Sequence, residues 1–593
     1  MRLLSIFLLL LGSSSHVIGQ QYQQDRMRDF QWISGTNFHA HVSGRDGFTL
    51  DFATLPPVVG YQLKPIDFYL CNGNICNKTG QLQFYSNCNK IIGPTHQVME
   101  NGEDLEWGTA ELSVGSPYQG GVLILPRFNM DSAYYMLYVA GNLTGDPSGS
   151  VGVRVNLAEV DMTLNSGLGK VVFKDSVLVS DSLDYGKLAA CRHANGRDWW
   201  IIVPRRKEDS FRRFLYDPAG FHDLGIQTIP DFLQYNKGVG NAIFSPNGTK
   251  YAIIDVFYNN KPDTSFLFEF DRCTGLLSNP LLLSQATDSV YVPNFCFSPN
   301  SRYLYKTTGR RVYQYDTEAV DINASRQLVA VADGYVNISL SLFMQMQLAP
   351  DGKIYMTSRT AAPFLHRIDY PDRPGPVCQV IQHCLDSLVA TTFCIPSFPH
   401  FRLGPLDGSS CDTLGIDNLP WARFRYAQDD AASPMAVQFT DLTAFEPAWW
   451  HWDFGELGSG DTSSERHPWH IYAGPGVYEV CLRAGNAYGA DTVYREVRVL
   501  PATVGSEEAE KMESTDYQVF PNPTTGEITL RGPEGTDRTR LAILYNPLGQ
   551  VVLQTTLVGP IHSLSLRFLP AGVYWLIIRE AGKIDHQQIL VKN

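Results

Sequence analysis

An internal repeat restricts the fold of this chain more than any other feature of its sequence. The segments FSPNGTKYAI, FSPNSRYLYK and LAPDGKIYMT begin at Phe244, Phe297 and Leu348. Each places an apolar and a small residue before proline, followed by an asparagine or aspartate, then glycine or serine, then an alternating run. Asn-Gly and Asp-Gly between such runs are strong hairpin signals, because type I′ turns require positive φ. We therefore expect tandem β units, each with a tight turn of this type.

The repeat has a period of about 52 residues, which is the range of propeller blades rather than of helical repeats. Earlier copies are HANGRDWWII, FNMDSAYYMLYV around Asp131, and CNKTGQLQFY around Thr79. The predicted turn residues are Asn195, Gly196, Asn247, Gly248, Asn300, Asp351 and Gly352. Several short strands per repeat, without helical heptads, are typical of a β-propeller.

Six repeats lie between Cys71 and about Arg373. The segments HVSGRDGFTLDF and FPHFRLG remain at either end and could combine into one more blade, so that N- and C-terminal strands close the ring. Closure would hide strand edges that otherwise pair with other chains. We predict an all-β chain in which residues 20–410 form a seven-bladed propeller, within a range of six to eight blades.

Several repeats also contain an alternating run that ends on an aspartate. These residues are Asp217, Asp271, Asp316 and Asp369. An aspartate after a strand caps the following turn by accepting hydrogen bonds from its backbone. We expect this structural role for all four, rather than a cluster of catalytic carboxylates.

Residues 1–19 have the pattern of a secretory signal peptide. Arg2 gives a positive start, Leu3 to Leu11 form a short apolar region interrupted only by Ser5, and small residues lead to Gly19. No later segment has the apolar length of a membrane helix, so we expect no membrane span. Export favours disulfides among the eleven cysteines, and the candidates are Cys71, Cys76, Cys88, Cys378, Cys384, Cys394 and Cys411. The net charge of -13 argues against a nucleic-acid partner, which would require basic patches.

Residues 419–500 contain short alternating runs separated by proline and glycine, which fit a β-sandwich. The stretch from WWHWDFGELGSGD to GPGVYEVCLRAGNAYG resembles a PKD domain, an immunoglobulin-like sandwich. The residues that carry this resemblance are Trp450, Trp452, Asp453, Phe454, Gly455, His470, Tyr472, Gly476 and Tyr478. It implies packing roles for them, with His470 as a buried structural histidine, and a domain that spaces its neighbours or contacts proteins and carbohydrates.

Residues 501–516 are polar and acidic and are predicted to be a linker to a final unit, residues 517–593. That unit carries VFPNPTTGEITL, LYNPLGQVV, LPAGVYWLII and the terminal ILVKN. It closely resembles the C-terminal sorting domain of the type IX secretion system of Bacteroidetes-type bacteria. Its motif residues are Pro521, Asn522, Pro523, Gly526, Gly549 and Gly572. The resemblance implies a small β-sandwich, recognition by the secretion machinery, and export through the periplasm to the outer cell surface or the medium.

Motifs of known catalytic chemistry are not found. No HExxH, GxSxG, P-loop, EF-hand or CxxC pattern occurs. His39 and His41 would share one face of a strand, but no acidic residue or cysteine stands at ligand spacing. A basic group could contact an anionic glycan, although a solvated blade edge explains it more simply: Arg205, Arg206, Lys207, Arg212 and Arg213. We predict no catalytic, cofactor-binding or metal-binding residue.

The N-terminal two-thirds resembles the propeller-like region that precedes such domains in Bacteroidetes surface proteins, and loosely resembles YVTN and WD-type propellers. GQLQFYSNCNKIIGPTHQVMENGEDL, VDMTLNSGLGKVVFKD and HANGRDWWIIV carry this likeness. It implies architecture and no particular activity. The first hypothesis is a binding or adhesion protein for an extracellular protein or glycan. The alternative is a polysaccharide lyase, glycosidase or lactonase with carboxylates converging in the central funnel. A third is a structural adhesin for gliding or biofilm.

Overall fold

The computed structural model divides the chain into two compact units, Met1–Pro501 and Ala502–Asn593. The structure describes residues 23–35, 45–105, 115–142, 151–184, 186–206, 209–230, 239–256, 263–283, 293–335, 341–358, 364–385, 394–428, 435–456, 458, 460–500, 518–521, 524–531, 539–545, 551–558, 561–567, 569, 572–580 and 583–591. Among these residues the elements are strands, apart from the short 3-10 helices η1 (Gln23–Met27), η2 (Asn165–Gly167) and η3 (Gly375–Cys378).

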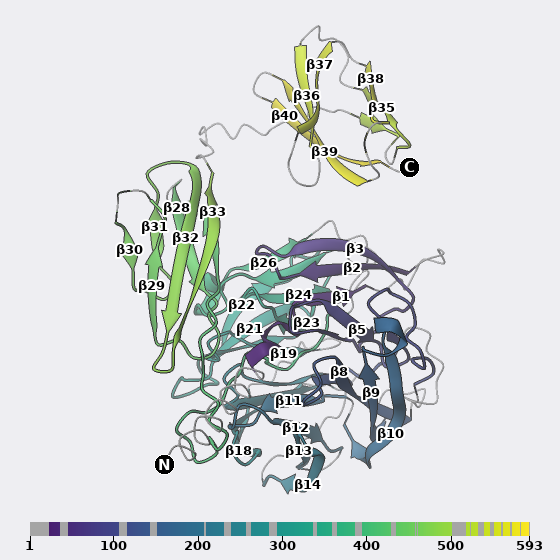
Figure 1. The fold of residues 1–593 in the computed structure, drawn as a ribbon, viewed down its shortest axis with the longest axis vertical. Coiled ribbons are helices and arrows are strands. Elements are labelled where there is room, and N and C mark those ends of the chain that lie inside the picture. Colours follow the sequence, from purple (N-terminus) through teal and green to yellow (C-terminus); the bar gives the residue numbers. More distant parts are fainter. Residues whose placement is uncertain are drawn as a thin grey trace, which may run out of the picture. The chain divides into compact units, whose positions relative to one another are not determined.

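Seven antiparallel sheets in the described part of the first unit are the blades of a propeller (Figure 1). Two blades have three strands each: β1 (Gln31–Ser34), β2 (Arg45–Asp51), β3 (Val58–Lys64); and β4 (Gly73–Cys76), β5 (Leu82–Ser86), β6 (Ile91–Ile92). Five blades have four strands each: β7 (Val122–Pro126), β8 (Ala133–Asn142), β9 (Val151–Asp161), β10 (Lys170–Leu183); β11 (Ala189–Arg192), β12 (Trp199–Pro204), β13 (Ser210–Asp217), β14 (Gly220–Thr228); β15 (Ala242–Phe244), β16 (Lys250–Asp255), β17 (Thr264–Asp271), β18 (Leu276–Leu282); β19 (Asn294–Phe297), β20 (Tyr303–Thr307), β21 (Arg311–Asp316), β22 (Gln327–Val331); and β23 (Phe343–Leu348), β24 (Ile354–Ser358), β25 (Leu365–Ile368), β26 (Val380–Cys384).

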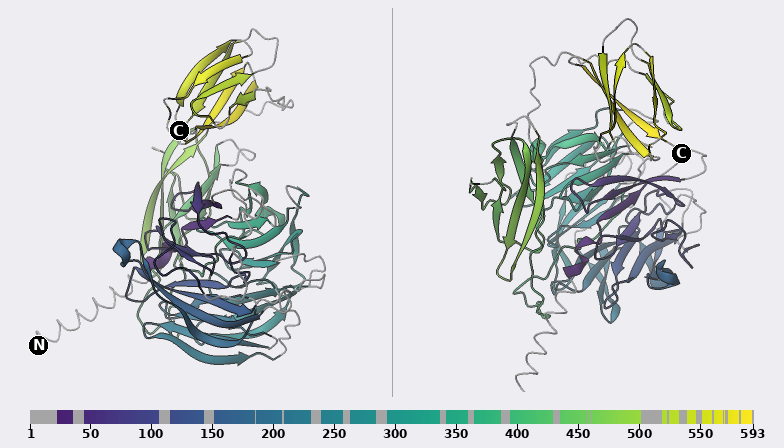
Figure 2. Two further views of the ribbon diagram at one scale, coloured as in Figure 1. Left: turned by 90° about the vertical axis from the view of Figure 1, so that its right-hand side faces the viewer. Right: turned by 45° about the horizontal axis from the view of Figure 1, so that its top comes forward.

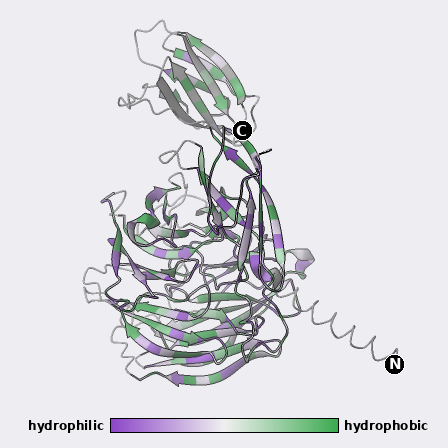
Figure 3. Cartoon of the chain, turned by 90° about the vertical axis from the view of Figure 1, so that its left-hand side faces the viewer, coloured by the Kyte–Doolittle hydropathy of each residue, from purple (hydrophilic) through white to green (hydrophobic). Residues whose placement is uncertain are grey.

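Burial explains why these residues form blades. The strand β12 is buried along its whole length, whereas β14 on the outside of the same blade alternates between half-buried and exposed residues. Inner strands lie between neighbouring blades and are apolar on both faces, while an outer strand meets solvent. Figure 3 shows the resulting apolar residues along the strands of the sheets. The ring closes by packing, since Trp32 of β1 contacts Tyr355 of β24 with ring centroids 5.9 Å apart.

The segment FPHFRLG does not form the closing strand that the sequence analysis proposed. Residues 394–404 make no strand, and β1–β3 form their sheet alone. Pro396 and Pro399 explain the difference, because proline has no N–H to donate to a sheet ladder. The segment instead lies alongside β1 inside the ring, where its contacts are described below.

Two further sheets in the first unit form a sandwich. They consist of β27 (Phe424–Gln428), β28 (Ala436–Asp441) and β31 (Trp469–Ile471), and of β29 (Trp449–Asp453), β30 (Thr462–Ser463), β32 (Gly476–Gly485) and β33 (Ala490–Val499). This sandwich lies beside the propeller (Figure 2). The Arg423 guanidinium donates to the carbonyl oxygens of Pro350 and Phe52 at 3.2 and 3.3 Å. Burial at this contact lowers the pKa of Arg423 to about 9.

The second unit is a smaller sandwich around a core that includes Leu530, Leu544 and Leu576. Its sheets consist of β34 (Gln518–Phe520), β35 (Glu527–Arg531) and β38 (Ile561–Ser565), and of β36 (Thr539–Tyr545), β37 (Val551–Val558), β39 (Gly572–Glu580) and β40 (Lys583–Val591). All strand pairings in it are antiparallel.

Candidate binding site in the central channel

Residues 394–404 cross the central channel of the propeller. At one end Ser34 Oγ donates to the Cys394 carbonyl oxygen, and at the other Arg402 forms an ion pair with Asp29 at 2.6 Å. These two contacts show that the segment runs opposite to the chain direction of β1. Farther along, Arg272 donates to the carbonyl oxygen of Gly404 on the opposite side of the ring. The segment therefore divides the channel.

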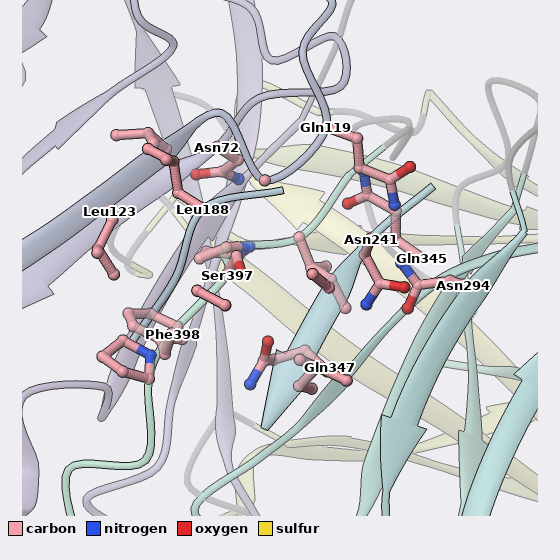
Figure 4. Close-up of a pocket in the computed structure, with 18 of the residues that line it drawn as sticks. Asn72, Gln119, Leu123, Leu188, Asn241, Asn294, Gln345, Gln347, Ser397 and Phe398 are labelled. Atoms are coloured by element: carbon pink, nitrogen blue, oxygen red, sulfur yellow. The ribbon is translucent and has the colours of Figure 1, made fainter. Parts of the chain in front are cut away.

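A pocket of about 50 Å³ lies in the channel above this segment. Its polar lining comes largely from side-chain amides in or just before the first strands of several blades (Figure 4). These amides belong to Asn72, Gln119, Asn241, Asn294, Gln345 and Gln347, and the crossing segment adds Ser397, Phe398 and His400. Since one water molecule needs about 10–15 Å³ of such volume, the pocket has room for a few waters or for the end group of a larger ligand.

Three of these amides join neighbouring blades. Asn72 Nδ2 donates to the Ile33 carbonyl oxygen at 2.9 Å. Asn241 donates to and accepts from the backbone of Phe295, and Asn294 Oδ1 accepts the backbone N–H of Met346 at 3.0 Å. These bonds fix the inner strands relative to one another and hold the wall of the pocket.

Gln119 differs from the other amides. Its side chain is only 2 % exposed, and neither Nε2 nor Oε1 has a hydrogen-bond partner in the described protein. Figure 4 shows the amide directed toward Asn241, Asn294 and Gln345. Leaving a buried polar group unpaired costs about 1–3 kcal/mol. An amide held in this state inside a polar pocket is suited to a ligand that both donates and accepts hydrogen bonds.

His400 is the only titratable residue among the described residues that line the pocket. Its Nε2 lies 3.1 Å from the Phe244 carbonyl oxygen, and burial lowers its pKa to about 4. The imidazole is therefore neutral at pH 7. Acid–base catalysis of sugar or lactone cleavage uses positioned pairs of titratable groups, whereas the described lining offers uncharged donors and acceptors.

The predicted blade-turn residues lie in the turns between the first two strands of four blades. The turn type differs from the expectation: positive φ falls on Gly196, Gly248, Ser301 and Gly352, and not on the preceding residues. Each preceding side chain instead accepts the backbone N–H two residues later, at 3.0–3.1 Å, which is the role of Asn195, Asn247, Asn300 and Asp351. Asn and Asp stabilise such turns without adopting positive φ themselves.

Three of the four repeated aspartates also cap turns. Asp217, Asp271 and Asp316 accept the backbone N–H two residues later. Asp369 instead forms ion pairs with Lys353 and Arg367.

The basic group on the blade of β11–β14 is paired within the chain. Arg205 and Arg212 share Asp181, and Arg212 also binds Asp223. Arg213 donates to the Thr274 carbonyl oxygen. Lys207, like His39 and His41, lies outside the described residues.

The PKD signature residues lie in and around the core of their sandwich. Trp452, Phe454 and Tyr472 are buried, and Tyr478 stacks on Tyr472 with ring centroids 4.1 Å apart. Trp450 is half-buried, and Gly476 begins β32.

Two more of the PKD signature residues have structural roles in the turn after β29. Asp453 accepts the backbone N–H of Gly455 at 3.0 Å, and Gly455 has a φ of 77°. A Cβ on Gly455 would lie 2.4 Å from the Glu479 carbonyl oxygen.

His470 is almost completely buried and stacks on Phe454 at 4.2 Å. Its Nε2 also lies 3.2 Å from a Glu456 carboxylate oxygen. Among the described residues, Glu456, Asp461 and His470 are a group whose ligand atoms, all within 4.8 Å, could share a cation. No sequence motif connects the three residues, because the acidic residues precede His470 in an irregular turn.

Three of the six residues of the sorting motif lie among the described residues. Pro521 follows β34, Gly572 begins β39, and Gly526 precedes β35 with a φ of 129°. The N–H of Gly526 donates to Thr524 Oγ1 at 3.1 Å. Asn522, Pro523 and Gly549 lie outside the described residues.

The two C-terminal parts of the chain each match a known protein family. Residues 425–499 match the family described as "PKD domain". Residues 518–592 match the family described as "Secretion system C-terminal sorting domain". The chain carries a PKD domain and a type IX sorting domain. The sorting domain indicates export to the cell surface or outside. None of the described helices has the length and apolar character needed to cross a membrane.

Several solved structures are similar to parts of this chain at low sequence identity. The PKD1 domain of Vibrio anguillarum Epp is 26 % identical, over 14 % of this chain and 95 % of its own, with a TM-score of 0.13. A functionally unknown protein from Desulfotomaculum acetoxidans is 13 % identical over 62 % and 99 %, with a TM-score of 0.35. PorZ of Porphyromonas gingivalis, a surface component of the type IX secretion system, is 12 % identical over 92 % and 68 %, with a TM-score of 0.26. No curated protein matches.

Proposed function

We propose that this protein is a secreted or surface-attached binding protein whose propeller holds an uncharged, hydroxyl-bearing end group of a glycan in the channel pocket. The observation that supports the proposal most directly is Gln119, a buried amide with both polar atoms unpaired in the described structure. Sugar hydroxyls donate and accept hydrogen bonds, so they complement both atoms of an amide. The sorting domain supports a location where such a ligand is met.

The size and charge of the pocket define the ligand further. At about 50 Å³ it admits an end group rather than a whole oligosaccharide. Its described lining contains no carboxylate, lysine or arginine, so a charged ligand would be buried there without a partner, which is costly. We therefore favour a neutral sugar over an acidic one at this site.

The test uses the full-length exported chain and calorimetric titration with neutral oligosaccharides of glucose, galactose, mannose and N-acetylglucosamine. At least one of them binds the wild type, and Gln119→Leu weakens its binding tenfold or more. The control is Gln81→Leu, because Gln81 is an exposed glutamine outside the pocket. Absence of binding to every sugar, or equal binding by wild type and Gln119→Leu, contradicts the proposal.

A further inference from the structure

A second and larger cavity lies between the propeller and the PKD domain. We call it the interdomain cleft; its volume is about 700 Å³, within the usual range of ligand sites. On the propeller side it is lined by the blade turns at Asn247, Asn300 and Gly352. On the PKD side it is lined by β28 and by the residues before and in β31. His400 lines both this cleft and the channel pocket.

Two arginines of the cleft surround one tyrosine. The guanidinium of Arg373 lies 4.1 Å from the ring centroid of Tyr370, and that of Arg425 lies 5.3 Å from it. Arg425 comes from the PKD domain and donates Nη2 to the Asp369 carbonyl oxygen at 2.7 Å. Within the described structure, the guanidiniums of Arg373 and Arg425 form no ion pair with a carboxylate.

The other two arginines of the cleft are paired with carboxylates. Arg466 forms an ion pair with Asp441 at 3.2 Å, and Arg402 is paired with Asp29 outside the cleft. Asp372 lies near the arginines, but its Oδ1 already accepts the Asn300 N–H at 2.9 Å. The lining side chains include four arginines and three carboxylates, the third being the exposed Glu446. Because Arg402 is already paired with Asp29, the arginines of the cleft that form no described ion pair are Arg373 and Arg425.

His467 lies near several arginines of the cleft. Burial, followed by the neighbouring Arg466, Arg425 and Arg373, lowers its pKa to about 4. Its Nδ1 accepts the Asp441 backbone N–H at 3.1 Å. Three guanidiniums from both domains therefore converge at this end of the cleft.

Two buried polar atoms of the cleft are unpaired. Arg425 is 6 % exposed and its Nε has no partner in the described structure; Gln438 is also 6 % exposed and its Oε1 has none. A ligand for this wall must present an acceptor to Arg425 and a donor to Gln438. Trp469, which is 45 % exposed at the same cleft, offers a ring face to an apolar surface.

We propose that the interdomain cleft binds an acidic oligosaccharide. A sugar carboxylate lies against Arg373 and Arg425, because guanidiniums bind carboxylates through charge-assisted hydrogen bonds. A neighbouring hydroxyl donates to Gln438 Oε1, and a sugar ring packs on Trp469. An acidic sugar has a carboxylate and a hydroxyl on neighbouring carbon atoms, and its ring also has an apolar face. This site differs from the channel pocket in ligand charge and in its use of the PKD domain.

The experiment titrates the full-length chain with trigalacturonate and, as a matched neutral probe, with its methyl ester. The wild type binds the acid at least tenfold more tightly than the ester, and salt weakens the acid complex. Arg373→Gln removes this preference. Because the Arg373 guanidinium forms no described hydrogen bond or ion pair and loses only its contact with the Tyr370 ring, this variant has a thermal midpoint within a few degrees of the wild type. The control is Arg212→Gln, which loses an arginine far from the cleft and retains the preference.

Three results would overturn the inference. They are equal binding of the acid and its ester, an unchanged preference in Arg373→Gln, and tighter binding of a hexaglutamate peptide, which would assign the cleft to an acidic protein. Gln119→Leu separates the two proposals, since it weakens neutral-sugar binding in the channel and leaves trigalacturonate binding unchanged. A result that contradicts ligand binding at one site therefore does not count against the other site.

Discussion

The side-chain amide of Asn241 is bonded to both backbone groups of Phe295 on the next blade. Nδ2 donates to the Phe295 carbonyl oxygen at 2.9 Å, and Oδ1 accepts its N–H at 2.7 Å. Because each sheet is formed within one blade, amide bonds of this kind are among the polar links between inner strands of different blades.

Replacement of Asn241 by leucine lowers the free energy of unfolding by about 2 kcal/mol, since two buried backbone groups of Phe295 lose their partners. Urea denaturation followed by tryptophan fluorescence measures the change. The matched variant is Gln119→Leu, which removes an amide without a hydrogen-bond partner among the described residues and leaves stability unchanged or raised. Equal destabilisation by both variants would show that the two amides have the same structural role.

A second disulfide is predicted between Cys71 and Cys88. Their Sγ atoms lie 2.6 Å apart in the buried core, in addition to the disulfide formed by Cys273 and Cys411. Exported proteins meet oxidising conditions in which such a pair forms a bond. Peptide mapping without reductant recovers Cys71 and Cys88 as one cross-linked product. Recovery of both as alkylated thiols, as expected for the buried Cys296, contradicts the prediction.

Acid destabilises the propeller through His366. This histidine is 1 % exposed, and burial, followed by the neighbouring His383, lowers its pKa to about 3. Below pH 6.5 the unfolded chain binds a proton that the folded chain excludes, so stability falls as pH decreases from 6.5 toward 3. Between pH 6.5 and 5 this loss is about 2 kcal/mol from His366 alone.

His366→Leu therefore gives a shallower loss of stability with falling pH, measured as urea midpoints at pH 5 and 7. His222→Leu is the control, because His222 is exposed on β14 and pairs with Asp217. If both variants follow the wild-type curve, another group causes the acid sensitivity.

Deletion of residues 517–593 separates export from folding. The sorting domain belongs to a compact unit of its own, so the truncated propeller and PKD domain remain folded. The truncated chain accumulates in the periplasm, where cell fractionation and protease resistance locate it. Secretion at the wild-type level would show that residues 517–593 are not the export signal.

Much of the architecture could be predicted from sequence because it is encoded in local patterns. The repeat around Asn247, Asn300 and Asp351 predicted tandem units of several short strands, and the turn side chains accept hydrogen bonds from the backbone two residues later. The turn type was wrong, since Asn followed by Gly permits either a type I′ turn or one in which only the second residue has positive φ. The predicted closing strand at FPHFRLG was also wrong, because Pro396 and Pro399 prevent this segment from pairing as a strand.

Local patterns in the sequence predict a β-propeller followed by a PKD domain and a type IX sorting domain, because each of these folds depends on contacts between residues close along the chain. Only the tertiary structure showed which residues meet in the channel and the interdomain cleft. Gln119 and Asn241 are 122 positions apart and follow no shared motif. Arg373 and Arg425 belong to different domains. Their proximity arises from closure of the ring and from domain packing, which no local pattern records.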